Sequence, residues 1–311
     1  MKSIRDGFGE ALVELGERNP NVVVLTADLA ESTRVKDFAE KFPKRFFQVG
    51  VAEQALVTVA AGMAAAGKIP FTTSYAVFSP GRTWEQIKVT ASLNDLPVKI
   101  IGAHAGFGAG PYGATHESLE DIALMRVMPN MVVIQPADFN EAKKAVFAVA
   151  GNGKPTYLRL ERAETPEINN EDSVFEIGKA NILFESKSPK AVIIGCGSIL
   201  NEALVAAKEL SKSKIGVTVI NNHTIKPIDE ETIIVAAKKT GAVVTIEEHQ
   251  IAGGMGSAVS EILSRNYPCP IEMVGVNDSF GESGKPEELR RKFGLTASNI
   301  EEAVKKVLAR K

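Results

Sequence analysis

The stretch Gly50-Val51-Ala52-Glu53-Gln54, which leads directly into a run of small and apolar residues from Ala55 to Gly67, decides how the first half of this chain folds. The run predicts a helix buried on most sides, because it has no polar face to offer to water. Phe46–Val49, just before it, has the composition of a strand. Glu53 is therefore expected to stand, shielded from water, where a strand gives way to a buried helix. From position alone, a first-turn acid that stabilises the helix dipole and a functional carboxylate are equally good interpretations.

Short apolar runs alternate with helical segments on both sides of this stretch. Val22–Leu25, Val98–Ile101 and Met131–Ile134 are expected to be strands buried on both faces of a parallel sheet. A second alternation starts at Ala191–Ile194 and ends in an amphipathic helix, Asn299–Leu308. This pattern predicts an α/β protein of two domains, each a mostly parallel sheet flanked by helices.

The boundary between the two predicted domains is marked by a change in composition. Residues 166–188 are rich in Glu, Asn, Ser, Pro and Lys, which is typical of a linker. We therefore expect a first domain over residues 1–165 and a second over residues 189–311. A length of 311 residues is sufficient for two such cores.

The overall composition excludes several classes of partner. A net charge of −2 provides no basic surface for nucleic acid or an anionic membrane. No apolar run approaches the roughly 18 residues of a membrane span, and the N-terminus lacks the apolar core of a signal peptide. Cys196 and Cys269 lie far apart and without metal-ligand spacing, as expected for small buried thiols in a reducing compartment. We expect a cytoplasmic protein that binds neither nucleic acid nor membrane.

Several candidate functional residues follow predicted strands of the first domain. Asp28 comes just after Val22–Leu25, at the end of a strand where ligands gather in open α/β sheets. Tyr75 and Phe78 are three residues apart, a spacing that can place both rings on one side of a turn, although core packing is the commoner reason for such a pair.

The segment from His104 to His116 contains four glycines between its two histidines. A glycine-rich loop after a buried strand is more often functional than structural, and the histidines are candidates for proton transfer or anion binding. The glycine spacing does not match a dinucleotide fingerprint. A phosphate-loop lysine and a cluster with metal-ligand spacing are also missing from the sequence.

Three arginines form the last group of candidates. The guanidinium groups of Arg5, Arg82 and Arg162 are suited to binding phosphate. Each of them taken singly is more often a solvated surface charge.

Taken together and in order, these stretches resemble the C-terminal half of transketolase. The matching segments are Asp28-Leu29, Gly50–Gln54, the Tyr75 and Phe78 pair, the loop ending in Ala114–Glu117, Pro129-Asn130 and Gln135–Asp138. The resemblance covers essentially the whole chain. It implies a domain that binds the pyrimidine of thiamine diphosphate, followed by the C-terminal domain of that family.

The resemblance also implies a partner chain. Thiamine diphosphate enzymes hold the diphosphate through Mg²⁺ on a separate domain with a Gly-Asp-Gly signature, and this signature does not occur here. The chain therefore resembles the smaller subunit of a split transketolase. The diphosphate and Mg²⁺ ligands are expected on an N-terminal transketolase subunit, in a heterotetramer with two copies of each chain.

Matching positions imply roles for single residues. Glu53 matches the glutamate that hydrogen-bonds the ring nitrogen of the aminopyrimidine and so activates the cofactor. Other cofactor-binding positions are Tyr75, Phe78 and Asp28. The loop residues His116 and His104 match catalytic positions near the reacting sugar. The positions that match the sugar-phosphate site are Arg5, Ser32, His104 and Arg162.

The sequence departs from the family pattern at two positions. Tyr112 stands where many transketolases have an aspartate that distinguishes donor sugars, and Gly81 stands where a third aromatic residue lines the pyrimidine pocket. Both departures leave the identity of the donor open. In the second domain, Gly253–Gly256 also matches the family, and tight packing at a subunit interface explains these glycines better than an anion site.

The function implied is a transketolase reaction of the kind used in the pentose phosphate pathway, in which a two-carbon ketol unit moves from a ketose phosphate to an aldose phosphate. The alternatives are a β-subunit of a 2-oxoacid dehydrogenase, a relative of 1-deoxyxylulose-5-phosphate synthase, and a non-catalytic scaffold subunit of the same fold. The histidine-bracketed loop and the arginines favour sugar phosphates over 2-oxoacids. An inert scaffold has no need of a buried acid such as Glu53.

Overall fold

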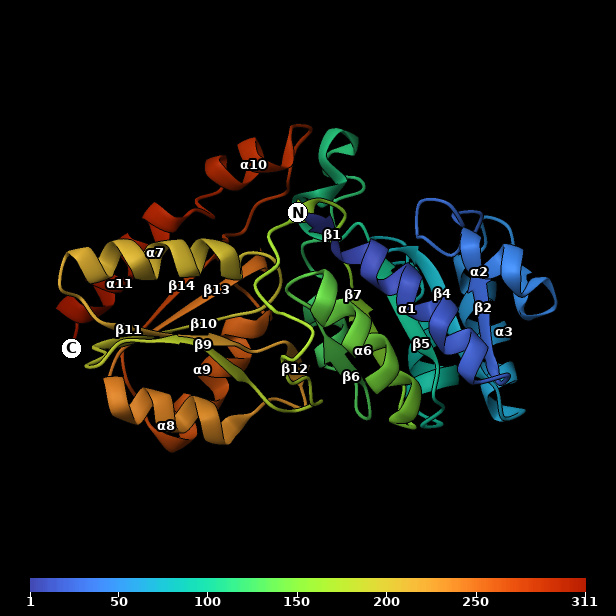
Figure 1. Cartoon of the computed structure of the whole chain (residues 1–311), viewed down its shortest axis with the longest axis horizontal. Coiled ribbons are helices and arrows are strands. Elements are labelled where there is room, and N and C mark those ends of the chain that lie inside the picture. The colour runs from blue at the N-terminus through green and yellow to red at the C-terminus, as the bar shows by residue number, and fades with distance from the viewer.

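The computed structural model describes every residue from Met1 to Lys311. The chain forms two α/β lobes that lie side by side, each built on its own sheet (Figure 1). The prediction of two α/β domains with mostly parallel sheets is confirmed. None of the helices combines the length and the apolar character that crossing a membrane requires.

The first lobe contains a seven-stranded sheet with the order β12-β6-β7-β5-β4-β2-β3. Its strands are β2 (Val22–Thr26), β3 (Phe46–Gln48), β4 (Ile69–Tyr75), β5 (Lys99–Ala103), β6 (Val132–Ile134), β7 (Thr156–Arg159) and β12 (Thr224–Lys226). All neighbours are parallel except β12 and β6. Helices cover both faces, which is why strands such as β2 and β5 are mostly apolar and fully buried.

The helical segments of this lobe connect the strands in sequence order. They are α1 (Ile4–Arg18), α2 (Lys36–Lys41), η1 (Pro43–Arg45), α3 (Glu53–Ala65), α4 (Trp84–Gln86), η2 (Ile87–Ser92), η3 (Gly106–Tyr112), α5 (Asp121–Arg126) and α6 (Phe139–Gly151). A two-stranded pair of β1 (Lys2–Ser3) and β8 (Glu164–Thr165) closes the lobe and brings its two ends together.

The second lobe contains a five-stranded sheet with the order β14-β13-β10-β11-β9. Its strands are β9 (Asn181–Glu185), β10 (Ala191–Gly195), β11 (Val217–Asn221), β13 (Val243–Gln250) and β14 (Ile271–Val276). Its helices are α7 (Leu200–Lys212), α8 (Glu230–Thr240), α9 (Met255–Asn266), α10 (Pro286–Lys292) and α11 (Ala297–Ala309). Figure 1 shows α7 and α11 on one face of the sheet and α8 and α9 on the other.

Two elements differ from the division expected from the sequence. The stretch expected to be a linker contains β9, an edge strand antiparallel to β11 whose polar ends hide its strand character. The strand β12 belongs by sequence to the second half of the chain but pairs with β6 of the first sheet. The domain boundaries at residues 165 and 189 stay predictions.

One edge of the first sheet gathers the residues of interest. The strands β2, β4 and β5 are parallel neighbours, so their carboxyl ends lie at the same edge. Asp28 follows β2, Tyr75 ends β4, and His104 follows β5. The N-terminus of α3, with Glu53 as its first residue, also lies there, because Ser74 of β4 hydrogen-bonds the Glu53 carboxylate.

Candidate active site

Glu53 is a buried carboxylate with two partners. Its side chain is 2% exposed. Oε2 accepts a hydrogen bond from Arg82 Nη1 at 2.8 Å, and Oε1 accepts a longer one from Ser74 Oγ at 3.4 Å. The Arg82 side chain is 50% exposed, so the ion pair has one end in solvent and the other in the protein. The buried acid predicted from the sequence is present, and its strongest contact is an arginine from the segment after β4.

Four of the predicted residues form one cluster of rings. The ring of Tyr75 lies 6.1 Å from Phe78 in a stacked arrangement and 4.1 Å from His104. His116 lies 5.4 Å from Phe78, edge to face. The ring of Tyr112 lies 5.3 Å from that of His116. The two histidines at the ends of the glycine-rich segment therefore lie against Tyr75, at the end of β4, and Phe78, three residues later.

Arg82 connects this cluster to Glu53. Its guanidinium carbon lies 4.9 Å from the centre of the Phe78 ring while its Nη1 reaches the Glu53 carboxylate. The guanidinium thus contacts both the buried acid and an aromatic face. The sequence had suggested phosphate binding for this arginine, on the basis of charge alone.

His104 is held in an unusual environment. It is 2% exposed, its backbone has a φ of 57°, and its Nδ1 has no hydrogen-bond partner. Burial, followed by the positive charges of Arg5, Arg162 and Arg34, lowers its pKa to about 3. His104 is therefore neutral near pH 7 and can donate or accept a hydrogen bond without adding charge. A strained backbone around an unpaired buried nitrogen is typical of a binding site.

The arginines converge on the same region. Arg5 donates from Nη1 to the Ser32 carbonyl at 2.8 Å, and its buried Nε has no partner. Burial, then Arg34 and Arg162, lowers the pKa of Arg5, as expected when cations are held close together. Arg162 lies with its guanidinium carbon 5.9 Å from the centre of the Tyr112 ring. An anion would relieve the mutual repulsion of these groups.

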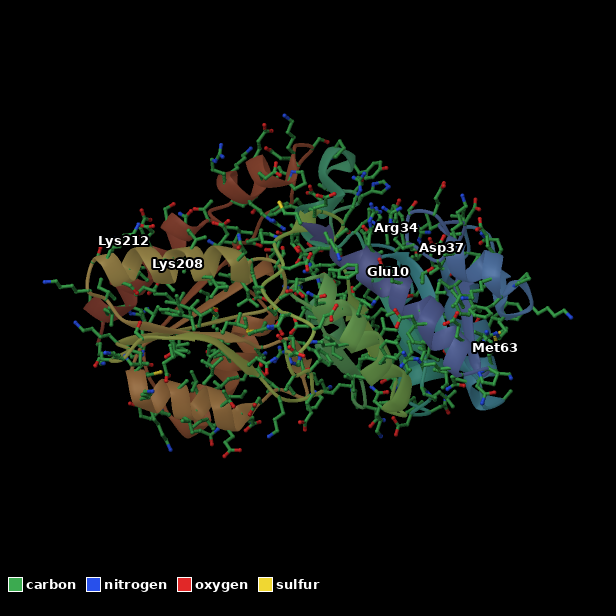
Figure 2. All side chains as sticks on the ribbon, viewed as in Figure 1. Glu10, Arg34, Asp37, Met63, Lys208 and Lys212 are labelled. Atoms are coloured by element: carbon green, nitrogen blue, oxygen red, sulfur yellow. The ribbon has the colours of Figure 1, made fainter.

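Sequence reasoning missed Arg34 and Ser74. Arg34 bonds Asp6 at 2.6 Å and lies beside Glu10 and Asp37 on the outer face formed by α1 and α2 (Figure 2). A signal for Ser74 was available, because it directly precedes Tyr75 at the end of a buried strand. No local pattern distinguishes Arg34 from other surface arginines.

Asp28 is the predicted site residue that the structure leaves apart. It is exposed at the end of β2, and its backbone amide bonds Gln48 Oε1 at 2.7 Å. No contact joins it to Glu53 or to the ring cluster within this chain. Its cofactor-binding role stays a prediction. No group of three or more His, Cys, Asp or Glu side chains is arranged to hold a metal ion.

Comparison with known proteins assigns both halves of the chain to one family. Residues 1–167 match the transketolase pyrimidine-binding domain, and residues 178–300 match the transketolase C-terminal domain. A provisionally named transketolase C-terminal section from Methanocaldococcus jannaschii is 44% identical over 302 residues, covering 96% of this chain and 94% of the relative. The 6-deoxy-6-sulfo-D-fructose transketolase subunit of Clostridium sp. is 41% identical over 99% of this chain and 95% of its own length.

The fold agrees with these matches. A solved structure described as a split gene transketolase in an inactive beta4 tetramer superposes with a TM-score of 0.93 at 46% identity, with 99% of both chains covered. The transketolase of Leishmania mexicana superposes with a TM-score of 0.84 at 25% identity, and there the chain covers 46% of that longer protein. The chain belongs to the transketolase family, as the subunit of a split transketolase that joins the pyrimidine-binding and C-terminal domains.

Proposed function

We propose that this chain is the smaller subunit of a thiamine-diphosphate-dependent transketolase, which moves a two-carbon ketol unit from a ketose phosphate to an aldose phosphate. The observation that supports this most strongly is the placement of Glu53. Glu53 is a buried carboxylate at the N-terminus of α3, at the ligand-binding edge of a parallel sheet, and its partner Arg82 lies over Phe78 of the ring cluster. The expectation that this helix is buried on most sides is wrong for this chain, because α3 buries one face and exposes the other, including Thr58 and Val59.

The residues present fit the aminopyrimidine half of the cofactor. Glu53 supplies a shielded acceptor for a ring nitrogen, Tyr75 and Phe78 supply apolar faces, and His104 Nδ1 is a buried polar atom without a partner. Thiamine diphosphate, when bound, supplies the carbanion chemistry itself. The Glu53 carboxylate is the group that would accept or share a proton with the ring nitrogen.

Arg82 donates to Glu53 Oε2, so a ring nitrogen that bonds this carboxylate has to compete with the guanidinium. Because half of the Arg82 side chain is in solvent, the guanidinium has room to move into water when a ligand takes its place at Glu53. The Ser74 hydroxyl stays in reach of the other carboxylate oxygen and fixes its orientation.

The arginines indicate a sugar with an anionic end as substrate. Arg5 and Arg162 lie near the neutral His104, and a guanidinium can hold a phosphate through two parallel hydrogen bonds. The relative from Clostridium sp. is named for a sulfonated sugar, which shares a terminal anion with sugar phosphates. Tyr112, with Arg162 over its ring, is the residue we expect to distinguish donors. Ser32 contributes its carbonyl to the position of Arg5.

A partner chain is required by this proposal. The relatives named as a section or a subunit have nearly the length of this chain, and they match it over 94% and 95% of their own length. Exposed apolar side chains also lie on or next to α3 and η2, two helices that pack against each other; they are Val51, Val59, Val89 and Leu93. We propose that the N-terminal subunit covers these side chains and supplies the Mg²⁺ and diphosphate ligands, in a heterotetramer with two copies of each chain.

Calorimetric titration with thiamine diphosphate and Mg²⁺ tests whether the cofactor ligands are divided between the two chains in this way. We expect at most weak binding to the isolated chain and tight, Mg²⁺-dependent binding once the partner chain is present. Tight Mg²⁺-dependent binding by this chain alone would contradict the split site. Binding in the complex followed by turnover of a 2-oxoacid, and not of a sugar phosphate, would favour the 2-oxoacid dehydrogenase alternative.

A further inference from the structure

We propose that Arg290, on α10 of the second lobe, is a positioning residue that fixes the glycine-rich loop of the candidate active site through Glu248. The inference rests on the proposed function, because that function makes this loop catalytic. None of the residues in the connection touches the ring cluster itself.

The first link joins the loop to the second lobe. The backbone N–H of Phe107 donates to Glu248 Oε1 at 2.7 Å, and Glu248, on β13, is completely buried. The close approach requires glycine at position 106. Its φ is +66°, and a Cβ there would lie 2.2 Å from Glu248 Oε1. The start of the loop is therefore bonded to a carboxylate that belongs to the other lobe.

The second link joins that carboxylate to Arg290. Glu248 Oε2 accepts from Arg290 Nε at 2.5 Å. Arg290 Nη2 donates to Glu161 Oε2 at 3.1 Å and to Ser198 Oγ at 2.9 Å. Arg290 is thus shared by two buried carboxylates, one after β7 of the first lobe and one in the second. Without a cation, two buried negative charges would face each other, which is strongly unfavourable.

Packing along the loop supports the same connection. Phe107 stacks on Phe293, just after α10, with ring centres 4.8 Å apart. Further along the loop, a Cβ on Gly113 would lie 2.6 Å from Ser283 Oγ, so the segment before α10 lies directly against the backbone. The second lobe therefore contacts the loop near both ends.

This arrangement has a consequence for catalysis. A segment with four glycines loses more conformational entropy on ordering than most loops. Because contacts with the second lobe already fix the loop backbone, His116 is held against Phe78, and Tyr112 against His116, without a further loss of entropy when substrate binds. The second lobe thereby controls the geometry of a site whose side chains all come from the first.

Hydrogen exchange of the full chain, read at the Phe107 amide, tests the connection. In Arg290→Met we expect this amide to exchange about tenfold faster or more, because Glu248 loses the cation that orients it. The matched control is Arg291→Met, the same change at the exposed neighbour on α10, which should alter the rate by less than about twofold. Arg290→Lys replaces the Met variant if the latter does not fold, since lysine cannot bond both carboxylates as a fork.

A double variant shows whether Arg290 acts through Glu248. In a Glu248→Gln background, Arg290→Met should change the Phe107 exchange rate by less than about twofold, because the charge it orients is gone. Equal acceleration in both backgrounds, or no acceleration in either, would overturn the proposal.

Turnover in the complex with the partner chain separates this inference from the proposed function. Arg290→Met should lower kcat/KM for the ketose donor by about 10- to 100-fold while leaving cofactor affinity unchanged. An unchanged kcat/KM in a variant with a mobile loop would contradict the positioning role. A wild-type complex with no transketolase activity would instead refute the proposed function, and the exchange result would stand independently.

Discussion

At the scale of the residue, Glu53 is a buried carboxylate at the N-terminus of α3, and it is paired with the half-exposed Arg82. We expect Glu53→Gln to lower kcat of the complex by about 10²- to 10⁴-fold, because glutamine cannot exchange the proton that the proposed mechanism requires. The fold should persist, since the amide keeps the volume and can still bond Ser74. Glu85→Gln, at an exposed position on α4, is the matched control and should retain activity. Normal turnover by a folded complex carrying Glu53→Gln would contradict the proposed role of Glu53 in activating the cofactor.

Glu117 is a buried carboxyl whose raised pKa makes the stability of the chain depend on pH. It is 3% exposed, and neither of its carboxyl oxygens has a partner. Burial, then the charges of Glu248 and Glu282, raises its pKa to about 7 from 4.5. Between these pH values the unfolded chain releases the proton and the folded chain keeps it. The contribution of Glu117 to stability is therefore greatest below pH 4.5 and falls by up to about 3 kcal/mol as the pH rises from 4.5 to about 7.

We expect Glu117→Gln to abolish the fall in stability that Glu117 causes as the pH rises. The free energy of unfolding, measured by urea titration at pH 4.5 and pH 8, should show the variant gaining on the wild type by up to about 3 kcal/mol at the higher pH. Glu231→Gln, at an exposed position on α8, should follow the wild type at both pH values. A difference between variant and wild type that does not depend on pH would show that Glu117 is not protonated in the folded chain.

At the scale of the element, the glycine-rich loop depends on a single small residue. Gly106→Ala would place a Cβ 2.2 Å from Glu248 Oε1, at a positive φ. Because Glu248 is buried and tied to Arg290, it cannot move away, and we expect a loss of about 2 kcal/mol or more. Gly62→Ala, inside α3 with open space around it, should stabilise the isolated chain by up to about 1 kcal/mol. Equal melting temperatures for the two variants would contradict the tight contact.

The elements most visible in the sequence were those with local signals. Short, mostly apolar runs predicted β2, β5 and β6, because strands buried on both faces need few polar residues. The strand β12 has three residues and pairs with β6, about ninety positions earlier, so no local pattern could reveal it. The edge strand β9 was hidden in the predicted linker, because only three apolar residues lie between its polar ends, Asn181 and Glu185.

The candidate site was predictable where motifs have fixed spacing. Tyr75, Phe78, His104 and His116 were proposed from order and spacing, and the structure brings them together. The pairing of Arg82 with Glu53 was not foreseen, because it depends on the turn after β4 and not on sequence distance. The network of Arg290 could not be foreseen either, since its partners come from three separate segments.

At the scale of the whole molecule, the two lobes are joined by buried polar contacts and by a shared sheet. The strand β12 extends the first sheet, Asn221 donates to Glu141 at 2.8 Å across the lobes, and Arg159 donates to the Glu248 carbonyl at 3.0 Å. Such contacts would be left unsatisfied if one lobe unfolded alone. We therefore expect a single calorimetric transition for the isolated chain, with equal calorimetric and van't Hoff enthalpies. Two separated transitions would show that the lobes are independent.

The central claim is that this chain supplies half of an active site, and turnover by the reconstituted complex tests it most directly. The chain would be mixed with its partner subunit, thiamine diphosphate and Mg²⁺, and assayed with xylulose 5-phosphate and ribose 5-phosphate, with each chain alone as control. The account predicts turnover in the mixture and none with either chain alone. Full activity of one chain by itself, or a complex that binds the cofactor and transfers a ketol unit from no sugar, would contradict it.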